Sequence, residues 1–249
     1  MAENVLYKYN DVALGVLTYN VRHRKTYDIL CLLKTLGYKN VKVYAIPLQY
    51  QKKFQPLLQH RPEMPWQVDT ENLCSNFSYK YVEIESYNDI NEHTGNIILV
   101  GGAGLLPDTF IKKYKVINAH PGYIPNCRGL DAYKWAIYEK QPIGVTAHLI
   151  GEEVDAGEVI IRRKIQIFKG DTFYSVAQRV YENEIAVLVD AIPYVVENKN
   201  LEYIGGNEYI VHKRMPKDIE LGLLNAFEEY KTGVVDNGIS GFETTISNT

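Results

Sequence analysis

Two polar residues near the end of an apolar run have side chains suited to acyl transfer. In the segment INAHPGYIPNCRG, Asn118 and His120 stand two positions apart, and Pro121-Gly122 follows them. Side chains two apart on a strand point to the same face. An amide can hydrogen-bond a developing oxyanion, and an imidazole can move a proton near neutral pH. The pattern predicts an acyl-transfer pair; the alternative is a structural histidine beside a turn-forming asparagine.

A carboxylate follows further along the chain, in the segment GEEVDAGEVI. Here Asp155 lies in a glycine-bounded turn between two apolar, β-branched runs. A carboxylate in this position can orient an imidazole, or help a water molecule to relay protons from an amine. The alternative is a turn aspartate that hydrogen-bonds its own backbone.

Glycines mark a third candidate, the segment LVGGAGLLP over Leu99–Pro107. Glycines after a strand let the backbone approach a ligand closely. A dinucleotide site is disfavoured, because its glycine signature should follow the first strand with GxGxxG spacing, whereas the first predicted strand here leads into NVRHRKTY. The segment favours a loop that offers backbone donors and acceptors to a flat heterocycle, with a plain strand–helix turn as the alternative.

The elements that must position these residues alternate along the first half of the chain. Short apolar runs predict strands, and helical spacing predicts the segments between them. Strands are expected over 11–19, 40–48, 79–85, 96–102 and 115–123, helices over 24–38, 51–60, 86–93 and 105–114, and a loop over 60–78. This order predicts an α/β fold with a mostly parallel sheet and helices on both faces. Ligands bind at the carboxyl ends of such strands, where Asn118 and His120 fall.

The second half of the chain has a different texture. A helix is expected over 130–141, two antiparallel strands over 143–150 and 158–167, and a long helix over 172–198 that Pro193 bends. We therefore expect a core domain over residues 1–200 and a small C-terminal extension over 201–249. The extension should hold a short strand, one helix after Pro216 and a frayed Gly/Ser/Thr-rich tail.

Composition excludes several classes of protein. The 249 residues have a formal net charge of -3, without the basic excess that nucleic-acid binding requires. Cys31, Cys74 and Cys127 form no CxxC pair or disulfide framework. The polar start and the lack of a run of roughly 18 apolar residues predict no membrane segment and a cytoplasmic protein. No metal site is expected, because His120 and His148 have no second ligand at metal spacing.

The motifs together are more specific than each alone. VINAHPGYIPNCRG, followed by IGVTAHLIGEEVDAGEVI, resembles the folate-dependent formyltransferases, which include glycinamide ribonucleotide, methionyl-tRNA and nucleotide-sugar enzymes. The resemblance extends over about residues 12–198 and is strongest over 96–158. It implies a Rossmann-like sheet, N10-formyltetrahydrofolate as the formyl donor, and Asn118, His120 and Asp155 as the catalytic residues.

The same resemblance implies the binding residues. The pteridine ring would lie against the backbone of two segments, namely Gly102, Ala103, Gly104, Leu105 and Leu106, and Glu153 and Val154 with Asp155. Arg128 falls in the family's Pro-x-x-Arg-Gly arm, which borders the acceptor. The alternative for Arg128 is a loop arginine that pairs with a nearby carboxylate.

Features that the chain lacks narrow the choice among the acceptor classes of this family. Transfer RNA is disfavoured by the acidic charge and by only about 50 residues after the core. Glycinamide ribonucleotide enzymes of the family have a Gly/Ser-rich phosphate loop after the first strand, where this chain has TYNVRHRKTY. We therefore expect a nucleotide-linked amino sugar, destined for surface polysaccharide or flagellin glycans.

Four residues of this loop are expected to meet the diphosphate of such an acceptor, namely Tyr19, Arg22, His23 and Arg24. The alternative is a charged, solvated helix start. Glycinamide ribonucleotide transfer, hydrolysis of the formylfolate, a nucleotide-binding dehydrogenase and a non-catalytic sugar-nucleotide module stay open. The segment LEYIGG and the last helix could form a homodimer contact.

Overall fold

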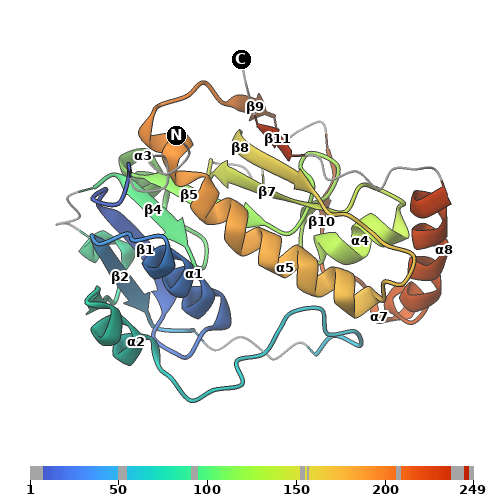
Figure 1. The fold of residues 1–249 in the computed structure, drawn as a ribbon, viewed down its shortest axis with the longest axis horizontal. Helices are drawn as coiled ribbons and strands as arrows, with labels where there is room; N and C mark the ends of the chain where they lie inside the picture. Colours follow the sequence, from blue (N-terminus) through green and yellow to red (C-terminus); the bar gives the residue numbers. More distant parts are fainter. Residues whose placement is uncertain are drawn as a thin grey trace. The chain divides into compact units, whose positions relative to one another are not determined.

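The computed structural model describes residues 8–49, 55–90, 95–151, 155, 157–205, 209–236 and 244–246 (Figure 1). The chain divides into two compact units. The first unit comprises Met1–Lys52, Glu63–Asn118 and Leu188–Asn198, and the second comprises Lys53–Pro62, Ala119–Val187 and Lys199–Thr249. The boundary expected at residue 200 stays a prediction.

Parallel strands form the centre of the first unit. Their order is β3 (Lys80–Glu83), β2 (Val41–Ile46), β1 (Leu14–Tyr19), β4 (Ile97–Val100) and β5 (Lys115–His120), and each neighbouring pair runs parallel. Every residue of β4 is buried, as expected of a strand covered on both faces. The chain reverses its direction of progress between β1 and β4, which is the Rossmann-like order. The predicted α/β class is confirmed.

Helix α1 (Arg24–Thr35) follows β1 and has an apolar stripe along one side. Ile29, Leu30 and Leu33 are completely buried. The helix ends at Leu36, and Gly37 follows with φ +83°, a left-handed conformation in which glycine carries no steric penalty. The helix predicted over 24–38 is therefore confirmed.

Helix α2 (Thr70–Phe77) corrects the sequence-based prediction of a loop over residues 60–78. The Asp69 side chain accepts a hydrogen bond from the backbone N–H of Asn72 at 2.8 Å, which caps the helix start. Leu73 and Cys74 are buried on its inner face. The segment has a composition typical of loops, yet residues 70–77 form a helix of about two turns with a capped start.

The other helical elements of the first unit are short. They are the 3-10 helix η1 (Tyr87–Asp89), α3 (Asp108–Lys113) and α6 (Ile192–Val196). The Ser86 side chain caps η1, in a reciprocal capping box with Asp89.

The strands of the second unit that follow β5 in the nine-stranded sheet are antiparallel to one another. Strand β7 (Gly144–Leu149) pairs with β8 (Gly157–Lys164), and β9 (Glu202–Ile204) and β11 (Thr244–Ile246) also pair antiparallel with β8. The predicted hairpin is confirmed. The expectation of a frayed tail over 234–249 is wrong for 234–236, which are helical, and for 244–246, which form β11; the remaining tail lies outside the described residues.

The helices of the second unit are α4 (Ala132–Tyr138), α5 (Phe173–Asp190), α7 (Lys217–Glu220) and α8 (Leu223–Asp236). Two expected long helices are each divided. The helix expected over 172–198 ends at Asp190, and the chain restarts as α6 with Pro193 in its first turn. Proline donates no backbone N–H, so it interrupts the hydrogen bonds of a continuous helix. The second breaks before Leu223, where Gly222 lies in a turn.

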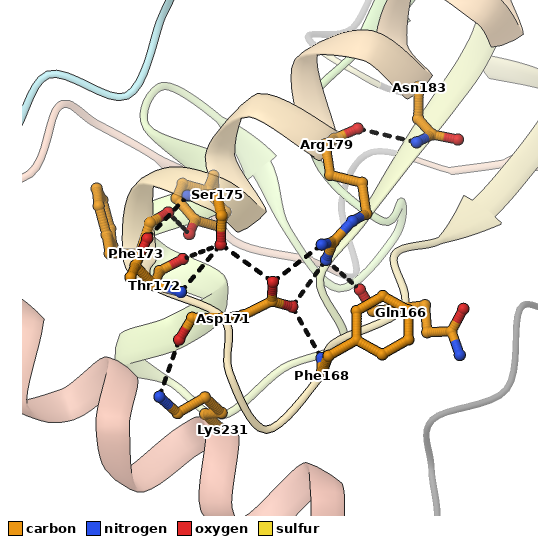
Figure 2. Close-up of polar contacts among 10 residues, drawn as sticks. Gln166, Phe168, Asp171, Thr172, Phe173, Ser175, Arg179, Asn183 and Lys231 are labelled. Atoms are coloured by element: carbon orange, nitrogen blue, oxygen red, sulfur yellow. Dashed lines mark hydrogen bonds and ion pairs between the residues drawn. The ribbon is translucent and has the colours of Figure 1, made fainter.

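A polar cluster holds the start of α5 (Figure 2). The guanidinium of Arg179 donates to both carboxylate oxygens of Asp171, at 2.8 and 2.9 Å, and Ser175 Oγ donates to the same carboxylate at 3.0 Å. Arg179 holds the pKa of the Asp171 carboxyl below its ordinary value. Lys231 of α8 donates to the Asp171 carbonyl at 2.9 Å, so this cluster joins α5 to α8.

Buried carboxylates hold residues 55–62 against the rest of the second unit. Glu220 accepts hydrogen bonds from the backbone N–H groups of Leu57 and Leu58, at 3.0 and 3.1 Å, and pairs with the buried Lys134. Arg61 pairs with the buried Glu184. The helix expected over 51–60 is not formed over 55–60, where these backbone N–H groups point to a carboxylate instead.

Candidate active site

His120 and Asp155 meet in the second unit. His120 is the last residue of β5, and its ring Nδ1 lies 3.4 Å from Oδ2 of Asp155. The two side chains are 5% and 15% exposed, so the pair is shielded from most of the solvent. The distance is longer than a tight hydrogen bond, so the two groups form a charge contact rather than a short hydrogen bond.

The opposite edge of the imidazole is held by the backbone. Nε2 of His120 lies 3.0 Å from the carbonyl oxygen of Cys127. Because a carbonyl oxygen only accepts, this contact requires a hydrogen on Nε2. A Cβ at Gly122 would lie 2.5 Å from Nε2 and 2.4 Å from the Cys127 carbonyl oxygen. Glycine at 122 therefore makes room for the ring in this orientation.

Asp155 accepts a backbone hydrogen bond as well as facing His120. The N–H of Gly129 donates to Oδ2 at 2.8 Å. The second oxygen, Oδ1, lies 3.9 Å from Nε2 of His148, a residue of β7 that is 2% exposed. Asp155 has φ +45°, an uncommon conformation for a residue other than glycine, and such conformations occur often at functional sites. The Asp155 carboxylate therefore has partners outside its own turn, which disfavours the alternative of an aspartate that bonds only its own backbone.

Asn118 lies two residues before His120 on β5. It is the last residue of the first unit and is half-buried, whereas His120 is buried. The alternation of a strand gives the two residues the same face of β5. The structure thus brings His120 and Asp155 together and keeps Asn118 on the same strand.

The glycine loop after β4 lies at the carboxyl ends of the first unit's strands. Gly101 and Gly102 both donate their N–H groups to the carbonyl of Leu17, at 3.0 Å each. Gly104 donates to the hydroxyl of Tyr87 at 3.1 Å, and Leu105 is 94% exposed. Backbone N–H groups of the loop thus hold it against β1 and Tyr87, and the Leu105 side chain points to solvent.

The loop between β1 and α1 contacts the glycine loop directly. Tyr19 and His23 stack edge to face with ring centroids 5.7 Å apart. A Cβ at Gly102 would lie 2.8 Å from the Tyr19 ring and 3.0 Å from the His23 ring, so glycine permits this close approach. Burial raises the pKa of the Tyr19 hydroxyl. These residues lie at the switch point of the parallel strands, where such folds bind ligands.

Arg24 is engaged by its surroundings. Its Nε lies 2.7 Å from Oδ2 of Asp28, and a terminal nitrogen donates to the Glu63 carbonyl at 3.0 Å. The guanidinium also lies 4.8 Å from the ring centroid of Trp66. These contacts favour a structural role at the start of α1.

Arg22 is exposed and lines a pocket of about 430 Å³. The other lining residues are Asn20, Val21, Asp69, Thr70, Glu71, Tyr81 and Glu83. Three of these are carboxylates, so the pocket carries more negative than positive groups. Such a lining suits hydroxyl groups or an ammonium group better than a diphosphate.

The remaining predicted binding residues differ in position. Arg128 is 1% exposed and donates to the Tyr209 carbonyl at 3.5 Å, so it is buried and bonded within the protein, which favours the structural alternative. Glu153 and Val154 lie outside the described residues.

Several residues around the pair were missed by sequence reasoning. Gly122 and His148 lie within the two recognised motifs, and the structure places them beside His120 and Asp155. Their membership of the motifs was a usable signal in the sequence. His212 lies far along the chain, and its ring Nδ1 is 3.2 Å from the Arg128 carbonyl oxygen. No motif marks His212.

Neither a metal-binding cluster nor a membrane-spanning helix is present among the described residues. No group of three or more His, Cys, Asp or Glu side chains within it is arranged to hold a metal ion. Among the same described residues, no helix has the length and apolar character needed to span a bilayer.

The fold and site define an α/β protein with a Rossmann-like order of parallel strands and a buried histidine–aspartate pair after the last of them. The family model described as formyl transferase matches residues 27–192. The chain belongs to the formyl transferase family.

A protein with a similar sequence carries a formyltransferase name. A phosphoribosylglycinamide formyltransferase from Haemophilus influenzae is 31% identical over 129 residues, which cover 49% of this chain and 58% of that protein. This chain therefore spans less than two thirds of that relative.

Solved structures share the fold at lower identity. A phosphoribosylglycinamide formyltransferase from Anaplasma phagocytophilum is 18% identical, with a TM-score of 0.57 over 81% of this chain and 98% of that one. A sugar N-formyltransferase from Shewanella sp FDAARGOS_354 is 19% identical, with a TM-score of 0.55 over 86% of this chain and 87% of that one. Both acceptor classes occur on this fold.

Proposed function

We propose that this chain transfers the formyl group of N10-formyltetrahydrofolate to the amino group of a nucleotide-linked amino sugar. The observation that carries the formyl-transfer step is the shielded contact between Nδ1 of His120 and Oδ2 of Asp155. Family membership over residues 27–192 supports the same chemistry. Acyl transfer needs an oxyanion partner and a route for one proton, and this contact can provide both.

The chemical step forms one carbon–nitrogen bond and breaks another. The acceptor amine attacks the formyl carbon, and the carbonyl oxygen becomes an oxyanion. The side-chain amide of Asn118 and a protonated His120 stabilise this negative charge. The amine loses one proton, and the departing nitrogen of the folate gains one, so no redox partner is required. Asp155 keeps His120 oriented and accepts the amine proton, directly or through water.

The formyl donor fits the loop after β4. Gly104 has no atom within 4 Å of the position of a Cβ, so there is open space beside the loop. Because the N–H groups of Gly102 and Gly104 are used within the protein, we assign contact with the pteridine to the backbone of Ala103, Leu105 and Leu106. Glu153 and Val154 stay predicted contacts.

The amino-sugar acceptor is supported by the segment after β1. This segment, residues 20–23, contains no glycine, whereas a tightly bound terminal phosphate is commonly held by glycine-rich backbone. The Arg22 pocket, with its carboxylates, offers acceptors for sugar hydroxyl groups. We assign Arg22, Tyr19 and His23 to the acceptor; Arg24 and Arg128 stay predictions with weaker geometric support.

Glycinamide ribonucleotide is the second candidate acceptor. Its support is the 31% identity to the Haemophilus influenzae phosphoribosylglycinamide formyltransferase. Substrate choice belongs to the site rather than to the fold, so identity over 129 residues does not determine the acceptor.

A direct assay distinguishes the two acceptors. The purified protein is mixed with N10-formyltetrahydrofolate and either glycinamide ribonucleotide or one of a panel of nucleotide-linked amino sugars. Released tetrahydrofolate is followed by absorbance, and the formylated product by mass spectrometry. We expect product only with an amino sugar. Product with glycinamide ribonucleotide alone would contradict the sugar proposal, and tetrahydrofolate release without any acceptor would indicate a hydrolase.

A further inference from the structure

One peptide group lies between the catalytic aspartate and a histidine from the C-terminal part of the chain. The carbonyl oxygen of Arg128 is 3.2 Å from Nδ1 of His212. The N–H of the same peptide group, contributed by Gly129, donates to Oδ2 of Asp155 at 2.8 Å. A donor on the oxygen of a peptide group polarises it and strengthens the hydrogen bond from its N–H. The two contacts therefore reinforce each other.

His212 is anchored on both edges of its ring. Its Nε2 lies 2.9 Å from Oε1 of Glu139, and its side chain is 6% exposed. Trp135 stacks on the imidazole, with ring centroids 4.9 Å apart and planes tilted by 31°. Both ring nitrogens face oxygen atoms, and the carbonyl oxygen can only accept. The ring is therefore hydrogen-bonded at both nitrogens, with Nδ1 donating to the Arg128 carbonyl.

The backbone around this histidine fits the peptide group closely. Strand β10 (Val211–His212) runs parallel to β6 (Arg128–Gly129), and Leu130 N–H donates to the His212 carbonyl at 2.9 Å. Gly129 has φ +88°, and a Cβ there would lie 2.2 Å from the His212 carbonyl oxygen. A side chain at 129 would separate the two strands. Glycine thus allows the approach that brings His212 to the peptide group.

We propose that His212, held by Glu139, is a positioning residue for the catalytic Asp155. It acts through the Arg128–Gly129 peptide group, whose polarised N–H fixes Oδ2 of Asp155 opposite His120. The catalytic consequence rests on the proposed formyl transfer, whereas the hydrogen-bonded connection does not. The C-terminal segment that contains His212 then contributes to the active site without touching a substrate.

The connection is tested by nuclear magnetic resonance on 15N-labelled protein. The amide proton of Gly129 should resonate downfield in the wild type, because it donates to a carboxylate through a polarised peptide group. His212→Ala should move it upfield, and His212→Gln, which retains one N–H donor, should move it less. The exposed neighbour variant Lys213→Ala should leave it unchanged.

A second variant covers the case in which His212→Ala does not fold. Glu139→Gln keeps the His212 ring and removes only the negative charge beside Nε2, so a smaller upfield shift is expected. A Gly129 amide resonance that stays at its wild-type position in a folded His212 variant, or in Glu139→Gln, would overturn the proposal.

Kinetics test the catalytic consequence. His212→Ala should lower kcat on the order of tenfold, as is typical when a residue supporting a catalytic group is removed, with KM for the formyl donor unchanged. In an Asp155→Asn background the same change should have no further effect on kcat. Equal factors in both backgrounds would show that His212 acts independently of Asp155. Absence of formyl transfer in the wild type, with a normal Gly129 response, would reject the proposed function and leave the connection standing.

Discussion

Oδ2 of Asp155 faces Nδ1 of His120 at 3.4 Å, while the ring's other nitrogen lies 3.0 Å from a backbone carbonyl. The imidazole is therefore held at Nε2 and faces a carboxylate at Nδ1. An imidazole with both nitrogens protonated satisfies this arrangement as an ion pair. Because Nε2–H is held by the Cys127 carbonyl, Nδ1–H is the group that can donate to an oxyanion formed beside the pair.

Replacing Asp155 with asparagine should lower kcat on the order of 10²-fold or more, because an amide provides one acceptor oxygen and no negative charge for His120. Steady-state release of tetrahydrofolate measures the loss. The matched control is Asp108→Asn, which changes an exposed aspartate in the first turn of α3 and should retain wild-type turnover. A mild effect of Asp155→Asn would reduce Asp155 to a turn residue.

Gly122→Ala should impair catalysis by moving the imidazole. The added methyl group would lie 2.5 Å from Nε2 of His120, so the ring must shift. Misplacement of a catalytic group by about 1 Å can cost roughly 10²-fold in rate. Gly170→Ala is the control, because no atom lies within 4 Å of its Cβ position. Equal kcat values for the two variants would show that the close contact around Nε2 is unimportant.

Asp171→Asn should change how stability depends on pH. The folded-state pKa of this carboxyl is lowered, chiefly by Arg179, so its contribution is present above the unfolded pKa of about 3.9 and is lost as the pH falls through the folded pKa. Urea unfolding should show that the asparagine variant is less stable at pH 7, with a gap that narrows below about pH 4. A gap that is constant across this range would exclude ionic stabilisation at Asp171.

Lys134→Met should destabilise the protein by roughly 3–5 kcal/mol, because Glu220 would keep a buried charge without its cation. Denaturant unfolding measures the change. Adding Glu220→Gln to Lys134→Met should recover part of the loss, since the glutamine oxygen can still accept from Leu57 and Leu58. A double variant less stable than Lys134→Met would contradict this explanation.

The predictable parts of the molecule are those with local signals. The strands around Asn118 and Asp155 follow from apolar runs and turns within a few residues. Helix α2 was missed because its cap, Asp69, lies in a segment whose composition resembles a loop. Local capping decides such helices, and composition alone does not reveal it.

Contacts between distant residues account for the rest. His212 meets Glu139 and Arg128 across 73 and 84 positions of sequence, so no short motif could reveal the connection. Glu220 likewise accepts from Leu57 and Leu58 across more than 160 positions and replaces the helix expected there. In both places the partners of a polar group are set by tertiary packing rather than by local propensity.

The central claim is that His120 and Asn118 stabilise the oxyanion of formyl transfer. Single-turnover formation of the N-formyl product, with folding checked by thermal unfolding, tests it most directly. For both His120→Ala and Asn118→Ala we predict a rate constant reduced by about 10²-fold or more in a folded protein. A folded His120→Ala variant that formed product at the wild-type rate would contradict the assignment of the active site.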